Sequence, residues 1–424
     1  MLNRGIKKWD LVLMTINSII GAGIFGLPSK IFQSAGVYSI AAFFACAAVV
    51  LIFILCYAEV SSRFDKTGGP YIYTLASFGR FPAFLMGWLL LLSRIFTYAT
   101  LINLIPTYLS FFSPELNEPA TRIIIMLIIT AGIFYVNHIG VKNLAAVSNV
   151  LTLSKLIPLA IFILVGLFFL QPSLFTVKHI PTIPAFSNSV LLLVFAFGGF
   201  ETVLITSGEI KNPAKTLPFA LLTATAVVAI FYILIQVVSI GTLPTLASTE
   251  KPIADAAVGF MGNGGGLLIT IGAVISILGT LMVIILGGSR LPFALSEEKQ
   301  FPKFFSYVHP IYKTPTWSIL TVSVVAFAVA VSWTFISALT ISAIIRVVGY
   351  LVGCGSLIQL RQSMKDQKDY FKVRYGNILA VAGIILSFWL LSAAKWNELR
   401  NAAIFLSAGA VLFLFQMNFF KKDK

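Results

Sequence analysis

Long apolar segments recur along the whole chain and are separated by short polar stretches. A bilayer core about 30 Å thick is crossed by roughly 20 apolar residues in helical form. Each segment is predicted to be a helix, because every backbone polar group inside lipid must be paired within the protein. The twelve predicted spans cover residues 10–34, 38–61, 83–112, 121–139, 144–170, 188–208, 217–240, 265–289, 316–333, 336–359, 376–394 and 399–419.

The composition agrees with an all-α integral membrane protein. Of the 424 residues, 58% are hydrophobic and 11% are charged, whereas a soluble domain is about half apolar and a quarter charged. The apolar runs are continuous and do not alternate as the strands of a membrane β-barrel would. The first run lacks a small-residue cleavage site and contains glycines, so we interpret it as a retained helix and not as a signal peptide.

The distribution of lysine and arginine predicts the orientation. With the N-terminus in the cytoplasm, the inner segments hold 21 basic residues and the outer loops hold five. Cytoplasmic loops carry the excess of basic residues in membrane proteins. We therefore expect a multi-pass protein of the cell membrane with both termini in the cytoplasm. The same bias explains most of the net charge of +15 without a nucleic-acid partner.

Glycine interrupts two of the predicted spans, at residues 19–28 and at residues 195–201, which are five spans apart. Breaks at matching positions of two halves indicate the central site of a transporter. Unwinding frees N–H groups that favour a carboxylate and carbonyls that favour an ammonium, and a zwitterionic amino acid offers both. The alternative is close helix packing. The candidate substrate-binding residues are Ile19, Gly21, Ala22, Gly23, Ile24, Phe195, Ala196, Gly198 and Gly199.

Around these breaks the sequence resembles the amino acid/polyamine/organocation permeases, and the likeness covers nearly the whole chain. The motifs that carry it are Gly21 to Phe25, then Glu59, Arg63 and Phe64 with residues 67–73, then residues 209–213 with Pro218, then Arg290, Pro302, Pro310, Thr314 and Pro315, and finally Arg346 with Tyr350. Asp65 departs from the pattern, because relatives commonly have proline there.

This resemblance implies a LeuT-like core of five plus five helices in inverted repeats, with discontinuous helices 1 and 6. The first repeat would occupy residues 1–170 and the second residues 188–359, followed by two accessory helices in residues 376–424. It also implies transport by alternating access without ATP. The sequence has no P-loop pattern, which agrees.

Charged residues inside the membrane are costly, so each is a functional hypothesis. Lys155 in span five resembles the lysine of proton-coupled members, and burial disfavours its charged form, which suits a proton carrier. Glu201 resembles the glutamate of basic amino acid and polyamine exchangers, and could couple protonation to gating or attract a cation. Purely structural pairing is the alternative for both. Arg94 and Arg346 could pair with Glu201 or Glu59, reach an interface or act as gates.

Two aromatic residues are candidate gates. Phe195 precedes the second break, where relatives place an aromatic ring over the substrate, and Tyr350 lies in span ten. The alternative for Phe195 is a lipid-facing or packing role, and the alternative for Tyr350 is an interfacial or core position. We group Tyr350 with Lys155 and Glu201 as candidates for proton coupling or gating.

The leading hypothesis is a proton-linked amino acid permease, and the rival is an amino acid or polyamine exchanger of the same fold. A non-transporting amino acid sensor is a remote alternative. An enzyme is not expected, since no nucleophile–base pair or metal cluster is visible, and neither is a cofactor. The cysteines have no paired spacing and the three histidines are far apart in the sequence. The expected partners are an amino acid, protons and lipid, with no nucleic acid, in a monomer or a homodimer.

The sequence leaves the substrate itself open. Small residues at Ala22 and Gly198 favour neutral amino acids of moderate size, whereas Glu201 favours cationic ones.

Overall fold

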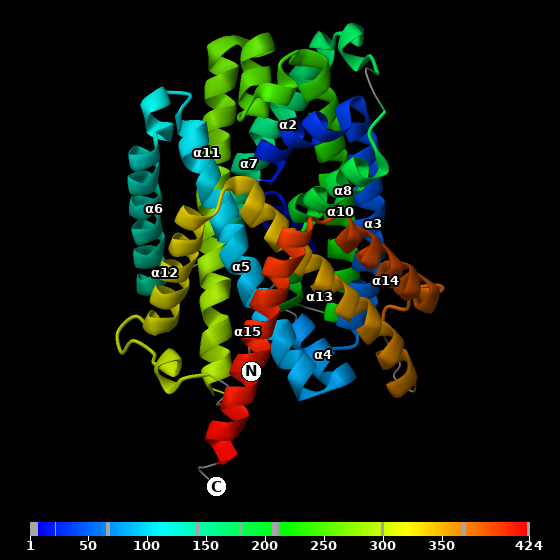
Figure 1. Ribbon diagram of the computed structural model, residues 1–424, viewed down its shortest axis with the longest axis vertical. Helices are drawn as coiled ribbons and strands as arrows, with labels where there is room; N and C mark the ends of the chain where they lie inside the picture. Colours follow the sequence, from blue (N-terminus) through cyan, green and yellow to red (C-terminus); the bar gives the residue numbers. More distant parts are fainter. Residues whose placement is uncertain are drawn as a thin grey trace.

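The computed structural model describes residues 7–21, 23–64, 68–140, 144–177, 180–205, 210, 212–297, 301–365 and 370–421; the side chains of 144–149 and 415–421 lie outside this description. The chain forms a bundle of helices (Figure 1). They are α1 (Lys8–Ile19), α2 (Gly23–Ala35), α3 (Ser39–Ser62), α4 (Pro70–Phe78), α5 (Arg80–Leu109), α6 (Pro119–Ile139), α7 (Leu144–Gly166), α8 (Ile183–Phe197), α9 (Glu201–Ile205), α10 (Pro213–Thr242), α11 (Pro252–Glu297), α12 (Thr316–Ser332), α13 (Phe335–Ser363), α14 (Gly376–Ser392) and α15 (Trp396–Lys421).

Proline marks the beginning of four helices. The first residues of α4, α6, α10 and α11 are Pro70, Pro119, Pro213 and Pro252. Proline suits this position because the N–H that it lacks would have no partner inside the helix, and its ring fixes a helical φ. Helix α4 is the short apolar segment that follows α3, at the end of the molecule where both chain termini lie (Figure 1).

Each of the twelve predicted spans coincides with a helix or with two helices separated by a break. Within the described ranges, seven helical stretches are by themselves long and apolar enough to cross a membrane. Two predicted spans are interrupted, one between α1 and α2 and the other between α8 and α9. Helix α12 is short, with only 17 residues. Helices α14 and α15 meet at an angle of 118°. The predicted all-α membrane architecture is confirmed.

Helix α11 extends beyond the predicted span 265–289 at both ends. Gly262 has φ +65°, so the part before it is a separate helical segment joined by a kink. At the other end the helix continues to Glu297, and Pro292, Leu295 and Ser296 in its last turns are buried. Ser296 there donates a hydrogen bond to the carbonyl of Pro302, at 2.9 Å.

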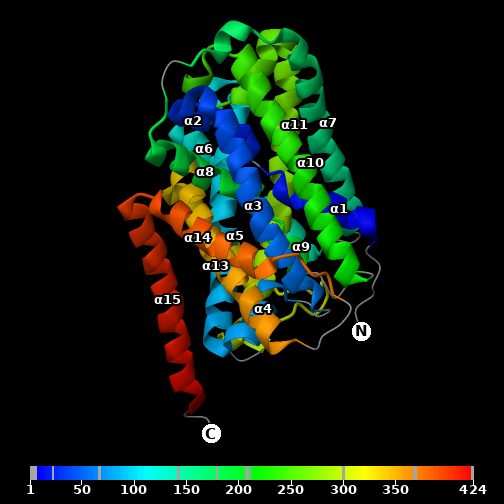
Figure 2. The ribbon, with the colours of Figure 1, turned by 90° about the vertical axis from the view of Figure 1, so that its right-hand side faces the viewer.

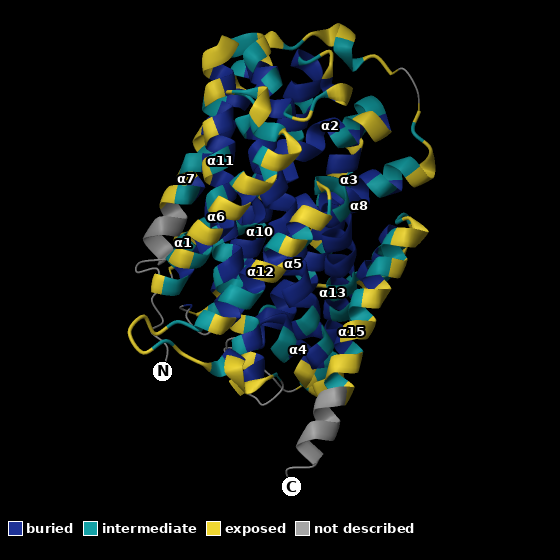
Figure 3. Cartoon of the chain, turned by 60° about the vertical axis from the view of Figure 1, so that its left-hand side comes forward, coloured by how far each residue is buried: buried dark blue, intermediate teal, exposed yellow. Residues whose placement is uncertain are grey.

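Helix α5 lies in the middle of the bundle and α6 at its edge (Figures 1 and 3). In the most apolar window of α5, 89% of the residues are buried, against 17% in α6. Helix α15 runs along the outside of the bundle (Figure 2). A helix that is buried on all sides can hold polar groups away from lipid, and α5 carries Arg94, Thr97 and Asn103 there. The centre of the bundle is therefore the place for a polar site.

Candidate substrate site

The first break separates α1 from α2. Helix α1 ends at Ile19, Ile20 has an extended backbone, and α2 begins at Gly23. Ala22, one of the predicted site residues, lies outside the described residues. Carbonyls at the end of α1 lose their helical partners here and need other donors.

Lys155 of α7 supplies the donor at this break. Its Nζ atom donates hydrogen bonds to the carbonyl oxygens of Ile20, at 2.7 Å, and Asn17, at 3.2 Å. It also lies 3.3 Å from the hydroxyl oxygen of Thr280 on α11. The Lys155 side chain is fully buried. The amine thus ties α7 and α11 to the end of α1, and a change in its protonation would alter the contacts of the break.

The second break separates α8 from α9. Helix α8 ends at Phe197, and Gly199 has φ +117°, a conformation that L side chains rarely adopt. Helix α9 begins at Glu201, whose carboxylate accepts a hydrogen bond from the N–H of Gly199 at 2.9 Å. The backbone N–H freed by the break is therefore paired with a carboxylate.

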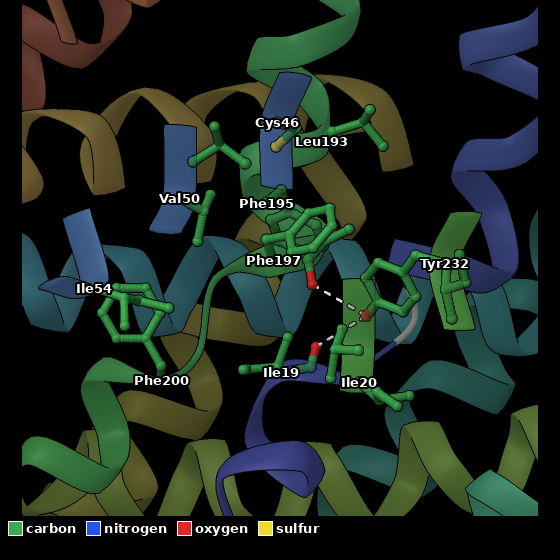
Figure 4. Close-up of a cluster of buried hydrophobic side chains, with 14 of the residues drawn as sticks. Ile19, Ile20, Cys46, Val50, Ile54, Leu193, Phe195, Phe197, Phe200 and Tyr232 are labelled. Carbon is green, nitrogen blue, oxygen red and sulfur yellow. Dashed lines mark hydrogen bonds between the residues drawn. The ribbon is translucent and has the colours of Figure 1, made fainter. Parts of the chain in front are cut away.

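The two breaks lie against each other. A Cβ atom on Gly23 would lie 2.9 Å from the Cα of Ala196, and one on Gly199 would lie 2.1 Å from the carbonyl oxygen of Ser18. The hydroxyl of Tyr232 on α10 lies 3.3 Å from the carbonyl oxygen of Ile19 and 3.1 Å from that of Ala196 (Figure 4). Glycine allows this close backbone approach, and Tyr232 bridges the two breaks.

A cluster of charged side chains adjoins the second break. Glu201 forms an ion pair with Arg346 of α13 and lies 3.4 Å from the hydroxyl of Tyr350. Arg346 also donates to the hydroxyl of Thr97, at 3.0 Å. Arg94 of α5 donates to the hydroxyl of Thr202 on α9, at 2.6 Å. All three charged side chains are at most 8% exposed.

The candidate gate residues are buried beside this cluster. The Phe195 ring lies 5.8 Å from the guanidinium carbon of Arg346. Tyr350 stacks on Phe200, which lies in the second break, with ring centroids 5.3 Å apart. Both aromatic side chains therefore contact residues of the α8–α9 break or its charged cluster, and they can respond to a movement there.

A cavity of about 500 Å³, which we call the vestibule, opens at the end of the molecule opposite the chain termini. Its lining includes Gly26, Lys30, Asn103, Arg122, Glu250 and Phe335. Phe335 at the start of α13 packs on Gly26 of α2, where a Cβ atom would lie 2.7 Å from the ring. Phe335 thus packs on the first turn of α2 at the edge of the vestibule.

On the side of the charged cluster that faces α4, the structure has a second cavity of about 20 Å³, lined by Glu201, Arg346 and Tyr350 among others. A cavity of this size holds about one water molecule. This cavity is therefore far smaller than the vestibule.

Comparison with known proteins decides the family. Residues 6–416 match the family described as "Amino acid permease". The chain belongs to the amino acid permease family. This confirms the resemblance to the amino acid/polyamine/organocation permeases and identifies the chain as a transporter and not an enzyme.

Three relatives from Bacillus subtilis (strain 168) illustrate the range within the family. The permease is 27% identical to a methylthioribose transporter, covering 97% of this chain and 93% of the relative. It is 26% identical to the branched-chain amino acid permease BcaP, covering 97% and 92%. It is 28% identical to the serine/threonine exchanger SteT, covering 96% and 95%.

The fold has a solved counterpart. The crystal structure of MhsT in complex with L-phenylalanine superposes with a TM-score of 0.64, covering 93% of this permease and 99% of that chain, at 12% identity. This likeness supports the LeuT-like architecture with broken helices 1 and 6. The exact division into repeats at 1–170 and 188–359, with two accessory helices in 376–424, remains a proposal.

A second ion-pair group closes the end of the permease near α4. Glu59 on α3 is fully buried. Its carboxylate accepts hydrogen bonds from Arg63, at 3.0 Å, from Arg361 at the end of α13, at 2.8 and 2.5 Å, and from the backbone N–H of Val373, at 2.8 Å. Glu59 therefore ties α3 to α13 and to the segment that follows.

The permease shows no group of three or more metal-binding side chains within its described residues. His138 and His309 are nevertheless neighbours, with ring centroids 5.0 Å apart, although they are far apart in the sequence. Cys46, Cys56 and Cys354 are buried free thiols. Cys56 and Cys354 are neighbours in the core, although they are far apart in the sequence.

The structure brings most of the predicted site residues of the permease together. Ile19, Gly23, Ala196 and Gly199 meet where the breaks touch, and Gly198 packs on Arg346. Gly21 lies on the other side of the first break, facing Leu101 and Thr280, and Ile24 is buried in α2.

Sequence reasoning missed Tyr232, Thr280 and Phe335. No motif marks them, since they are a tyrosine, a threonine and a phenylalanine within ordinary apolar helices. Only the packing of α10, α11 and α13 around the breaks gives them their positions.

Proposed function

We propose that this permease moves an amino acid across the cytoplasmic membrane by alternating access and couples that movement to protons. The substrate backbone would bind between the breaks, at Ile19, Gly21, Ala22, Gly23 and Ile24 on one side. Phe195, Ala196, Gly198 and Gly199 would contribute the other side. Carbonyls and N–H groups freed at the breaks suit the ammonium and the carboxylate of a zwitterion.

The contact between Lys155 and the carbonyls of Ile20 and Asn17 is the observation that carries the coupling. These carbonyls belong to the break that we propose as one wall of the substrate site. A protonated amine donates to both, whereas a neutral amine binds them more weakly. Loss of the proton would therefore loosen the end of α1, and substrate binding and protonation would influence each other.

Uptake by purified protein in liposomes tests this proposal. A panel of labelled amino acids and polyamines is offered with and without an inward proton gradient, to empty and to preloaded vesicles. We expect concentrative uptake into empty vesicles that the gradient drives. Uptake that does not depend on the proton gradient would contradict proton coupling. Absence of flux for every compound would contradict the transport function.

An amino acid or polyamine exchanger is the second candidate. The serine/threonine exchanger SteT is among the relatives, and Glu201 lies directly at the second break. An exchanger would take up labelled substrate only into preloaded vesicles. The Glu201–Arg346 ion pair weakens the argument for a cationic substrate, because the carboxylate already has a partner.

We further propose that both termini lie in the cytoplasm, as the distribution of basic residues predicts. The vestibule would then face outward and the Glu59 group inward. The oligomeric state, monomer or homodimer, would be read from the mass of the purified protein in detergent.

A further inference from the structure

The charged cluster at the second break holds more positive than negative charge. Two arginines, Arg94 and Arg346, lie there with one carboxylate, that of Glu201, which forms its ion pair with Arg346. Within the described part of the chain Arg94 forms no ion pair, and its hydrogen-bond partner is the neutral hydroxyl of Thr202. The charge of Glu201 attracts Arg94, and the charge of Arg346 repels it.

Such an excess is costly at this depth. Arg94 is 8% exposed and Arg346 is 7% exposed. A buried charge without a counter-charge loses its hydration and gains no equivalent partner. Charged groups inside membrane proteins persist where they serve a substrate or an ion. The excess of one positive charge therefore calls for an anionic partner.

Both arginines retain hydrogen-bonding capacity. A guanidinium has five N–H donors, and its planar fork suits a carboxylate with two bonds. In Arg346 one end nitrogen donates to Glu201 and the other to Thr97, and the buried Nε atom has no partner among the residues that the structure describes. Arg94 uses one nitrogen for Thr202. Donors therefore remain on both side chains.

These arginines flank the break that would hold the substrate. A Cβ atom on Gly198 would lie 2.4 Å from a guanidinium nitrogen of Arg346, which shows how closely the arginine packs on the backbone there. Thr202, the partner of Arg94, lies in the first turn of α9 just after the break. The two arginines therefore contact the backbone or side chains on either side of the second break, Arg346 at Gly198 and Arg94 at Thr202.

We propose that the substrate of this permease is an acidic amino acid, whose side-chain carboxylate is bound by Arg94 and Arg346. This inference rests on the proposed transport function. A zwitterionic neutral amino acid brings no net charge to the cluster, whereas an acidic one brings one negative charge and balances it. The side-chain carboxylate, which its amide analogue lacks, is then the group that the permease selects.

The test compares pairs of substrates that differ in one group. Purified protein in liposomes is given labelled glutamate or glutamine, and aspartate or asparagine, at equal concentrations. We expect the acid of at least one pair to be taken up about a hundredfold better, because a buried charge pair that lacks one partner is strongly disfavoured. Uptake of the amide equal to or better than that of the acid would overturn the inference while leaving amino acid transport established.

Arg94→Gln removes the arginine that has no ion pair. We expect the ratio of acid uptake to amide uptake to fall to about one, whatever the absolute rates, and Arg94→Lys to restore part of the preference. Arg80→Gln is the control, since Arg80 is exposed on the same helix. If Arg94→Gln does not fold, as judged by thermal unfolding in detergent, the comparison of acid and amide in the unchanged protein still decides.

An inorganic anion is the other source of negative charge. Uptake is therefore measured in chloride and again with chloride replaced by gluconate. Preference for the acid that is independent of chloride supports a substrate carboxylate at Arg94. Amide uptake that requires chloride would overturn the inference, because the cluster would then be balanced by an inorganic ion.

Discussion

The two helix breaks in the core are completed by side chains of opposite charge. At the α1–α2 break the amine of Lys155 donates to freed carbonyls, and at the α8–α9 break the carboxylate of Glu201 accepts from a freed N–H. Each charge suits the helix end that it meets, since carbonyls carry partial negative charge and N–H groups partial positive charge. The breaks therefore differ in the charged group that binds the freed backbone: an amine at the first and a carboxylate at the second.

The breaks also differ in how they are surrounded. Lys155 has neutral oxygen partners, from Asn17, Ile20 and Thr280, whereas Glu201 has a formal ion pair with Arg346. A lone amine among neutral acceptors can exchange its proton without leaving an opposite charge behind. A carboxylate fixed by arginine is far harder to neutralise. Proton coupling is thus better suited to the first break and charge selection to the second.

The largest expected contrast is between glycines of the two breaks. Gly199→Ala places a Cβ atom against the Ser18 carbonyl at a positive φ, so the backbones must separate. A displacement of about 1 Å at a reacting or binding site can lower the rate about a hundredfold. We expect the rate of uptake to fall by at least this factor. In Gly21→Ala the added Cβ atom would lie 3.5 Å from Leu101, which is an ordinary contact. The thermal unfolding of this variant should therefore match that of the unchanged protein. Equal behaviour of the two variants in uptake and unfolding would contradict this contrast.

Glu201→Gln should have the next largest effect. The variant leaves Arg346 and Arg94 without a buried counter-charge. Removing one partner of a buried ion pair lowers the free energy of unfolding by about 3–5 kcal/mol. Thermal unfolding in detergent measures the loss. The exposed Glu115→Gln is the control, and the double variant E201Q/R346Q should recover part of the stability. A single variant as stable as the parent would show that the ion pair contributes little.

Lys155→Ala tests the first break. We expect transport to lose its dependence on external pH, because the group that exchanges the proton is gone, and uptake at the optimum to fall about tenfold, within the range found for loss of a proton-transfer or coupling group. Uptake is measured across a series of external pH values, with the exposed Lys215→Ala as control. A full pH dependence in the variant would move the coupling elsewhere.

Tyr232→Phe should have the smallest effect. The variant loses a hydroxyl that contacts both breaks, and one net hydrogen bond contributes about 0.5–1.5 kcal/mol. We expect uptake to fall a few-fold with little change in pH dependence. Tyr307→Phe, whose side chain is 46% exposed, is the control. Loss as large as that in Gly199→Ala would mean that Tyr232 binds substrate directly.

The sequence predicts the fold and the breaks because both depend on local composition. Apolar length places the spans, and Gly21, Gly23, Gly198 and Gly199 mark where helices cannot run on. Proline likewise marks the starts of α4, α6, α10 and α11. The predicted span 265–289 lies within α11, which is longer at both ends and has a kink at Gly262 that hydropathy does not mark.

The partners of the charged residues could not be predicted in this way. Arg346 could have paired with Glu201 or with Glu59, and the choice depends on how far along α13 each carboxylate lies. Glu59 instead binds Arg361, fifteen residues after Arg346 in the same helix. The pairing of Arg94 with Thr202, and the bridge made by Tyr232, depend on contacts between helices far apart in the chain.

The burial of all three cysteines makes the permease suited to chemical mapping of its two faces. Shielded thiols react slowly, so a cysteine added at the surface would dominate the labelling. Glu115→Cys, near the vestibule end, should react with a membrane-impermeant maleimide on intact cells, whereas Lys303→Cys, near the opposite end, should react only after the membrane is opened. The reverse pattern would show that the chain is inserted the other way round.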